Sequence, residues 1–156
     1  MDPSKNKVRD WMTANPITID AGATIVEAIH LLKEKNVRRL PVVKAGKLVG
    51  LVTERMLLSF SPGKSTSMDT WEVHYLLAKT PVTQAMNAKP NTVTPETDIA
   101  DCAQLIHDRK LNGITVVDDR GNLVGILTTT NALEALIWFS KQAQLAAARQ
   151  AQQQKP

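Results

Sequence analysis

An internal repeat is the feature that most constrains how this chain can fold. Residues 8–43 align with residues 82–117 at a constant shift of 74 positions, and the match then continues at a shift of 75. The extra residue falls in a segment rich in turn residues, Asp118-Asp119-Arg120-Gly121, which matches Lys44-Ala45-Gly46. A surface hairpin absorbs such an insertion at little cost. The chain therefore consists of two homologous halves.

Each half predicts the same order of elements. A turn at Asn15-Pro16 leads into a short extended piece, residues 17–19. Thr24-x-x-Glu27 then has the form of a capping box and opens a helix, and Asp98 takes the cap position in the second half. Two apolar strands joined by a glycine-containing turn follow, and a second helix begins after them. The predicted strands are 40–43 and 48–53 in the first half, and 114–117 and 123–128 in the second.

The repeats leave a linker and a tail. We place the first repeat at 8–60 and the second at 81–137. The linker, residues 61–80, holds a short helix that Asp69-x-x-Glu72 opens. Residues 138–156 predict a helical tail, either frayed at its Ala/Gln-rich end or used in self-association.

Composition excludes several classes of protein. Cys102 is the only cysteine, so no internal disulfide and no cysteine-based metal motif can form. The three histidines are isolated and show no metal-ligand spacing, and no nucleotide-binding glycine loop is complete, although Gly63-Lys64-Ser65 resembles the end of one. No apolar stretch has the length of a membrane span, and the N-terminus has no apolar signal-peptide core. We therefore expect a cytoplasmic protein without catalytic activity, metal or cofactor.

The excess of positive charge lies in the first half. Residues 1–60 hold ten Lys and Arg against six Asp and Glu, whereas the remainder balances. A basic surface attracts phosphates or nucleic acid. Nucleic-acid binding is disfavoured because the chain has no run of basic residues and few aromatic side chains for stacking.

The repeats resemble the CBS domain, and two in tandem resemble a CBS pair, or Bateman module. The resemblance rests on Met-x-x-x-Pro at Met12 and Met86, on Leu-Pro-Val-Val at 40–43, and on the Leu-Val-Gly strands at 48–53 and 123–128. It implies an α/β fold in which two β-α-β-β-α repeats are related by pseudo-two-fold symmetry, with the sheets packed together and the helices outside. It also implies clefts that bind adenosine-containing ligands (AMP, ADP, ATP or S-adenosylmethionine), a homodimer, and regulation of an unknown partner protein.

The nucleotide signature of the family is a strand that ends in Gly-h-h-Thr/Ser-x-x-Asp, where h is hydrophobic. The threonines are present as Thr53 and Thr128, but Met56 and Asn131 stand at the aspartate positions. Methionine cannot accept a useful hydrogen bond from a ribose hydroxyl, whereas asparagine can accept one bond and donate another. By position, the resemblance implies these ligand-binding residues: Thr18, Arg38, Arg39, Pro41, Thr53, Arg55, Thr92, Asn112, Gly113, Thr115, Thr128 and Asn131.

Two functions remain open on this sequence. The first is a regulatory module that binds an adenosine-type ligand, with the second half the better candidate because it keeps Asn131. The alternative is a dimerisation or interaction module that has lost nucleotide binding, which Met56 favours. For Thr53 and Thr128, the alternative to ligand binding is a purely structural role as helix N-caps.

Overall fold

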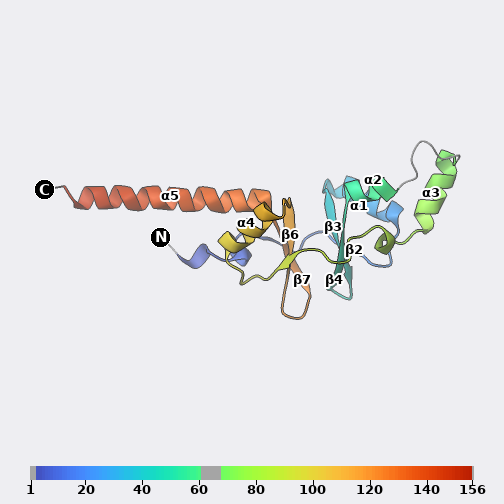
Figure 1. Cartoon of the computed structure of the whole chain (residues 1–156), viewed down its shortest axis with the longest axis horizontal. Coiled ribbons are helices and arrows are strands. Elements are labelled where there is room, and N and C mark those ends of the chain that lie inside the picture. The colour runs from blue at the N-terminus through green and yellow to red at the C-terminus, as the bar shows by residue number, and fades with distance from the viewer. Residues whose placement is uncertain (1–2, 61–67, 156) are drawn as a thin grey trace. The chain divides into compact units, whose positions relative to one another are not determined.

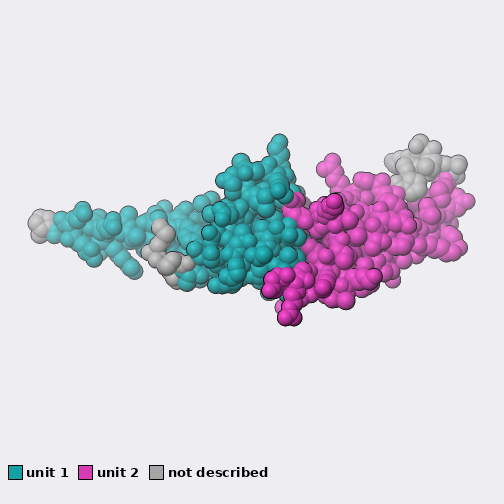
Figure 2. All heavy atoms as spheres, turned by 60° about the horizontal axis from the view of Figure 1, so that its bottom comes forward, with its two compact units in different colours: residues 1–14, 92–118, 124–156 teal, residues 15–91, 119–123 magenta. Residues whose placement is uncertain are grey.

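The computed structural model describes residues 3–60 and 68–155 and divides the chain into two compact units (Figures 1 and 2). Unit 1 comprises residues 1–14, 92–118 and 124–156, and unit 2 comprises residues 15–91 and 119–123. Part of the predicted polar loop at 59–67, with its Gly63-Lys64-Ser65 sequence, lies outside the described residues.

Unit 2 contains a three-stranded sheet in the order β2-β3-β4. Strand β2 runs parallel to β3, and β3 runs antiparallel to β4 with an irregularity between Val42 and Val43. Thr24 caps helix α1 through a complete capping box with Glu27, as predicted, and Asp69 caps α3 in the same way. The elements are β2 (Ile19–Asp20), α1 (Ile25–Lys35), β3 (Arg39–Lys44), β4 (Lys47–Thr53), α2 (Glu54–Phe60), α3 (Thr70–Lys79) and the 3-10 turn η3 (Val82–Gln84).

Unit 1 contains a four-stranded sheet in the order β1-β7-β6-β5. Strand β5 is parallel to β6, and β1 is antiparallel to β7. Asp98 stands at the cap position of α4, but its side chain makes no cap hydrogen bond and instead pairs with Lys7 Nζ at 2.6 Å. The elements are η1 (Pro3–Lys5), η2 (Val8–Asp10), β1 (Thr13–Ala14), β5 (Thr92–Val93), α4 (Ile99–Asp108), β6 (Gly113–Val117), β7 (Leu123–Thr128) and α5 (Thr129–Gln153).

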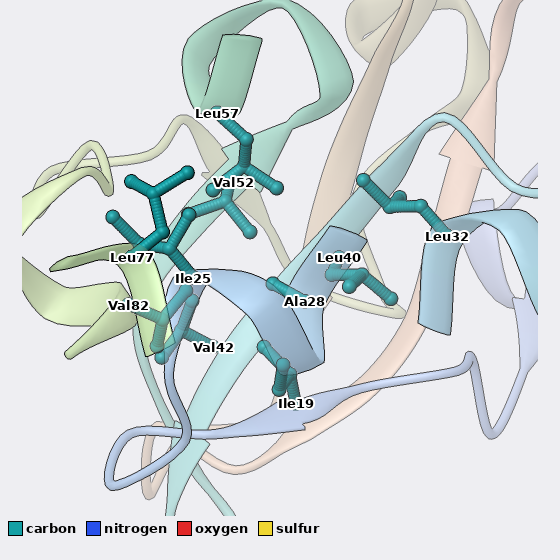
Figure 3. Close-up of a cluster of buried hydrophobic side chains, with 10 residues drawn as sticks. All are labelled: Ile19, Ile25, Ala28, Leu32, Leu40, Val42, Val52, Leu57, Leu77 and Val82. Atoms are coloured by element: carbon teal, nitrogen blue, oxygen red, sulfur yellow. The ribbon is translucent and has the colours of Figure 1, made fainter. Parts of the chain in front are cut away.

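The two cores are built from equivalent positions of the repeat. Figure 3 shows the core of unit 2, where side chains from the sheet meet those from the helices. Residues at the matching positions form the core of unit 1, and all of them except Val8 come from the second repeat. The matched pairs are Ile19/Val93, Ile25/Ile99, Ala28/Cys102, Leu32/Ile106, Leu40/Ile114, Val42/Val116, Val52/Leu127 and Val82/Val8.

The segment that opens each repeat packs in the unit formed by the other repeat. In unit 1, Val8 N donates to the carbonyl oxygen of Thr97 at 2.9 Å, and in unit 2, Val82 N donates to that of Ala23 at 2.8 Å. The bridge between Thr13 and Ile126 in unit 1 likewise matches that between Leu51 and Asn87 in unit 2. The boundaries of the compact units therefore differ from those of the sequence repeats at these two segments, and also at residues 119–123, which belong to unit 2.

Helix α5 continues unbroken to Gln153, whereas composition allowed for fraying in its Ala/Gln-rich part. Alanine, glutamine and leucine are strong helix formers, so local propensity explains the continuity. Within unit 1, the C-terminal half of α5 extends beyond the sheet and α4 (Figure 1).

Candidate functional site

The candidate site consists of two equivalent strand-to-helix junctions, one in each unit. The first junction is the β4–α2 connection, residues 53–56, and the second is the β7–α5 connection, residues 128–131. At the first junction, Thr53 Oγ1 accepts a hydrogen bond from Met56 N at 3.2 Å and so caps α2. Glu54 N donates to the carbonyl oxygen of Arg38 at 3.0 Å, which ties the start of α2 to the residue before β3.

The second junction repeats these contacts and adds a side-chain pair. Thr128 Oγ1 accepts from Asn131 N at 3.3 Å, and Thr129 N donates to the carbonyl oxygen of Asn112 at 3.1 Å. Asn131 Oδ1 in turn accepts from Thr128 N at 2.9 Å and lies 3.0 Å from Thr128 Oγ1. The amide of Asn131 is therefore folded onto the helix cap, and its oxygen is already engaged.

In unit 2, four of the six predicted residues lie on one face of the sheet. Arg39 and Thr53 are direct partners across β3 and β4, so their side chains share a face, and Pro41 follows Arg39 by two residues. Leu40, between Arg39 and Pro41, points into the core on the opposite face. Thr18 directly precedes the core residue Ile19 and therefore belongs to the face of Arg39.

Arg38 and Arg55 lie apart from this group. Side chains of consecutive residues in an extended chain point to opposite faces, and Arg38 lines a cavity of about 330 Å³ beside Leu57, Leu58 and Glu54. Arg55 is exposed in the first turn of α2. The structure therefore does not place the adjacent arginines 38 and 39 on the same face of the sheet.

In unit 1, the equivalent residues repeat the arrangement. Thr92 and Thr115 are partners across the parallel pair β5–β6, and Gly113 shares their face because it precedes Thr115 by two residues. Thr115 is almost fully buried, with 2% of its surface exposed, whereas Thr92 is exposed. Asn112 contributes its backbone carbonyl to the start of α5, as Arg38 does for α2.

The two junctions differ in charge. Burial lowers the pKa of Arg39, and the neighbouring Arg38 guanidinium lowers the same pKa further. Within the part of the chain that the structure describes, neither of these arginines nor Arg55 forms an ion pair with a carboxylate. The equivalent positions at the second junction hold Asn112 and Gly113. The first junction therefore carries arginine cations, whereas residues 128–131 of the second junction carry no charged side chain and offer an amide group.

Glu134 is a residue near the second junction that the sequence reasoning missed. Asn131 Nδ2 donates to Glu134 Oε2 at 3.4 Å, which places a carboxylate one helical turn after the asparagine. The Asn-x-x-Glu spacing was visible in the sequence, because residues three apart are neighbours on a helix. Glu134 is the only acidic residue in α5.

Two other expectations concern metals and membranes. In residues 3–60 and 68–155, no group of three or more His, Cys, Asp or Glu side chains is arranged to hold a metal ion. Across the same residues, no helix combines the length and the apolar character needed to cross a bilayer.

Comparison with known proteins gives the family. The CBS domain model matches residues 8–63 and 82–137. The CBS domain-containing protein YhcV of Bacillus subtilis is 30% identical over 122 residues, which cover 78% of this chain and 79% of YhcV.

Solved structures agree with this match. The crystal structure of CBSX2, an Arabidopsis thaliana CBS-pair protein, in complex with AMP has a TM-score of 0.72 and 31% identity, covering 86% of this chain and 98% of that one. The cytosolic domain of the Mg²⁺ channel MgtE in complex with ATP has a TM-score of 0.68 and 25% identity, covering 85% of this chain and 49% of that one. The chain belongs to the CBS domain family and carries two CBS domains in tandem.

Proposed function

We propose that this chain is a regulatory, non-catalytic CBS pair that senses an adenosine-containing ligand, of the AMP, ADP, ATP or S-adenosylmethionine type, at the second junction. The observation that carries the proposal is the arrangement around Thr128, where a helix cap lies at the end of β7 in the sheet whose one face carries Thr92, Gly113 and Thr115. Two relatives with the same fold are known in complex with adenine nucleotides, CBSX2 with AMP and MgtE with ATP.

The physical basis is the start of α5. Thr129 N and Asn131 N at this end already donate to the carbonyl oxygen of Asn112 and to Thr128 Oγ1. The helix dipole still adds partial positive charge here, which favours a phosphate or another anionic group. Helix α5 is 25 residues long, so its dipole is fully developed. Gly113 adds no side chain at the start of β6 and so allows a ligand to approach the backbone.

Asn131 would recognise a ribose mainly as a donor. Its Oδ1 already serves the cap, and of its two Nδ2 hydrogens one is directed at Glu134. The remaining hydrogen can be donated to a ribose oxygen. An aspartate would instead accept charge-assisted bonds from the ribose hydroxyls, which are roughly twice as strong. We therefore propose weaker binding than a complete signature would give.

Isothermal titration calorimetry of the full chain with AMP, ATP and S-adenosylmethionine tests the proposal. Replacing Asn131 with alanine should weaken binding about fivefold, since one neutral hydrogen bond contributes about 1 kcal/mol. Met56→Ala, the equivalent change in the first repeat, is the matched control and should leave the affinity unchanged. Absence of binding heat with all three ligands would contradict the proposal.

The alternative function is a dimerisation or interaction module without nucleotide binding. Two observations favour it: the methionine at position 56, and the engagement of Asn131 Oδ1 in the helix cap. Under this alternative, the protein is a dimer whose stability does not respond to adenosine ligands. Sedimentation velocity combined with the calorimetric titration separates the two functions. Under either function, the regulated partner and a cytoplasmic location stay predictions.

A further inference from the structure

Glu134 places a full negative charge beside the second junction. Its side chain is exposed, and its Oε2 atom accepts a hydrogen bond from Asn131 Nδ2 at 3.4 Å. Exposed carboxylates are ionised at neutral pH. Within residues 3–60 and 68–155, no lysine, arginine or histidine forms an ion pair with this carboxylate. Its charge is therefore available to a ligand bound beside Asn131.

Glu134 lies on the same side of α5 as Asn131, because residues three apart are neighbours on a helix surface. The proposed function assigns the second Nδ2 hydrogen of Asn131 to a ribose oxygen. The ribose and the carboxylate then share one amide group. Substituents on that ribose lie within about one Debye length of the carboxylate, roughly 8 Å at physiological ionic strength, so their charges interact with it.

The start of α5 offsets only part of this negative charge. The helix dipole supplies roughly half a positive elementary charge at this end. None of the residues that the family resemblance assigns to the ligand in unit 1 carries a charge, and these residues are Thr92, Asn112, Gly113, Thr115, Thr128 and Asn131. The carboxylate therefore opposes a multiply charged phosphate group more than the helix start attracts it. A ligand with one anionic and one cationic group matches both the helix start and the carboxylate.

The first repeat shows that the fold does not require a carboxylate at this position. Ser59 is the residue equivalent to Glu134, and its hydroxyl donates to the carbonyl oxygen of Arg55 at 2.7 Å. The first repeat also has Arg38 and Arg39 where the second repeat has uncharged residues. The glutamate is therefore a feature of the second junction alone and is not a requirement of the helix.

We propose that Glu134 is a specificity-determining residue of the second junction. It selects adenosine derivatives with a cationic 5′ substituent, such as the sulfonium group of S-adenosylmethionine, over adenosine phosphates. The carboxylate attracts the positive charge next to the ribose and repels the 5′-phosphate of AMP or ATP. This inference rests on the proposed function, because that function places the ribose at Asn131.

Isothermal titration calorimetry of the full chain with two pairs of ligands tests the inference. S-adenosylmethionine and S-adenosylhomocysteine differ by one methyl group and by the positive charge on sulfur, and AMP and adenosine differ by the phosphate. The parent protein should bind S-adenosylmethionine about fivefold more tightly than S-adenosylhomocysteine, the size expected for an exposed charge pair. AMP should bind no more tightly than adenosine.

Glu134→Gln removes the charge and keeps an oxygen that can accept from Asn131 Nδ2. In this variant, the preference for S-adenosylmethionine over S-adenosylhomocysteine should fall about fivefold, and the affinity for AMP relative to adenosine should rise about fivefold. The affinity for adenosine itself should not change, whereas a purely structural role would alter all four affinities together. Glu34→Gln, the same change at an exposed position of α1 in unit 2, is the matched control and should keep the parent ratios.

The adenosine titration separates this inference from the proposed function. If the parent and Glu134→Gln both bind adenosine and show the same two ratios, the role of Glu134 is overturned and the proposed function stands. If neither adenosine nor any of the other three ligands binds, both are overturned.

Discussion

At the scale of single residues, two glycines determine how closely the opening segments of the two repeats approach the sheets. A Cβ atom on Gly125 would lie 2.6 Å from Met12 Sδ and 3.0 Å from the carbonyl oxygen of Thr13. A Cβ on Gly50 would meet Met86 in the same way and would lie 3.0 Å from the carbonyl oxygen of Asn87. These glycines are therefore required by the lack of space for a side chain.

Gly125→Ala should lower the free energy of unfolding by about 1–3 kcal/mol, because the backbone of β1 must move away from β7 to admit the methyl group. Urea denaturation measures the change. Gly22→Ala is the control, because its Cβ would meet only the exposed side chain of Asp20. Equal stability of Gly125→Ala and the parent would show that the Met12 segment does not pack as described.

Cys102 predicts a dependence of stability on alkaline pH. Burial raises the pKa of its thiol from 9.0 to about 11, so the folded state keeps the proton that the unfolded state loses first. The stabilisation of the folded state by the buried, protonated thiol is complete below pH 9 and is lost as the pH rises from 9 to about 11. Unfolding free energies over this range should fall more steeply for the parent than for Cys102→Ala. Parallel curves would contradict the prediction.

At the scale of elements, the main feature is the exchange of the opening segments. Lys7 bridges to Asp98 in unit 1, and Pro81 bridges to Thr24 in unit 2, at equivalent positions of the repeat. Each opening segment adds one fully buried valine to the core of the unit it joins. Trp11 extends this packing in unit 1 through an edge contact with Trp138, with ring centroids 6.0 Å apart.

Val8→Ala and Val82→Ala should each destabilise the protein by about 2 kcal/mol, since each side chain is fully buried. Chemical denaturation of the two variants beside Ile17→Ala measures the effect. Ile17 is 38% exposed, so Ile17→Ala should lower the free energy of unfolding less than either valine substitution does. If Val8→Ala behaves like Ile17→Ala, the N-terminal segment is not part of the core of unit 1.

At the scale of the whole molecule, two similar halves carry different chemistry at matching positions. The first junction has the Arg39 guanidinium but no hydrogen-bonding side chain at position 56, and the second has an amide at position 131 without a nearby arginine from β6. Under the proposed function, this difference predicts one ligand per chain rather than two.

Met56→Asp should give the first junction the missing acceptor and raise the calorimetric stoichiometry from one adenosine ligand per chain to two. Asn131→Asp should keep the stoichiometry at one and tighten binding about tenfold, because a charge-assisted bond replaces a neutral one. Isothermal titration calorimetry with AMP distinguishes these outcomes. A stoichiometry of one for Met56→Asp would contradict the prediction that the first junction lacks only an acceptor at position 56.

Local patterns in the sequence were sufficient for the long helices and strands, but not for β1 or the 3-10 turns. The capping boxes of α1 and α3, the strands that end at Thr53 and Thr128, and the two-fold repeat of the core all follow from the spacing of residues close to one another in the chain. The separation of Arg38 from Arg39 also follows from the strand period of two, although the family resemblance implied that both bind the ligand.

The sequence by itself determined the two β-α-β-β-α repeats, because caps, turns and apolar periodicity act over a few residues. Only the tertiary structure decided which repeat each opening segment joins. The hydrogen bonds of Val8 and Val82 reach partners far along the chain, and no local pattern encodes such a partner. The orientation of the Asn131 amide, by contrast, is set by neighbours in the sequence. Thr128 and Glu134 are each three residues away from Asn131, and their contacts hold its oxygen on the helix cap.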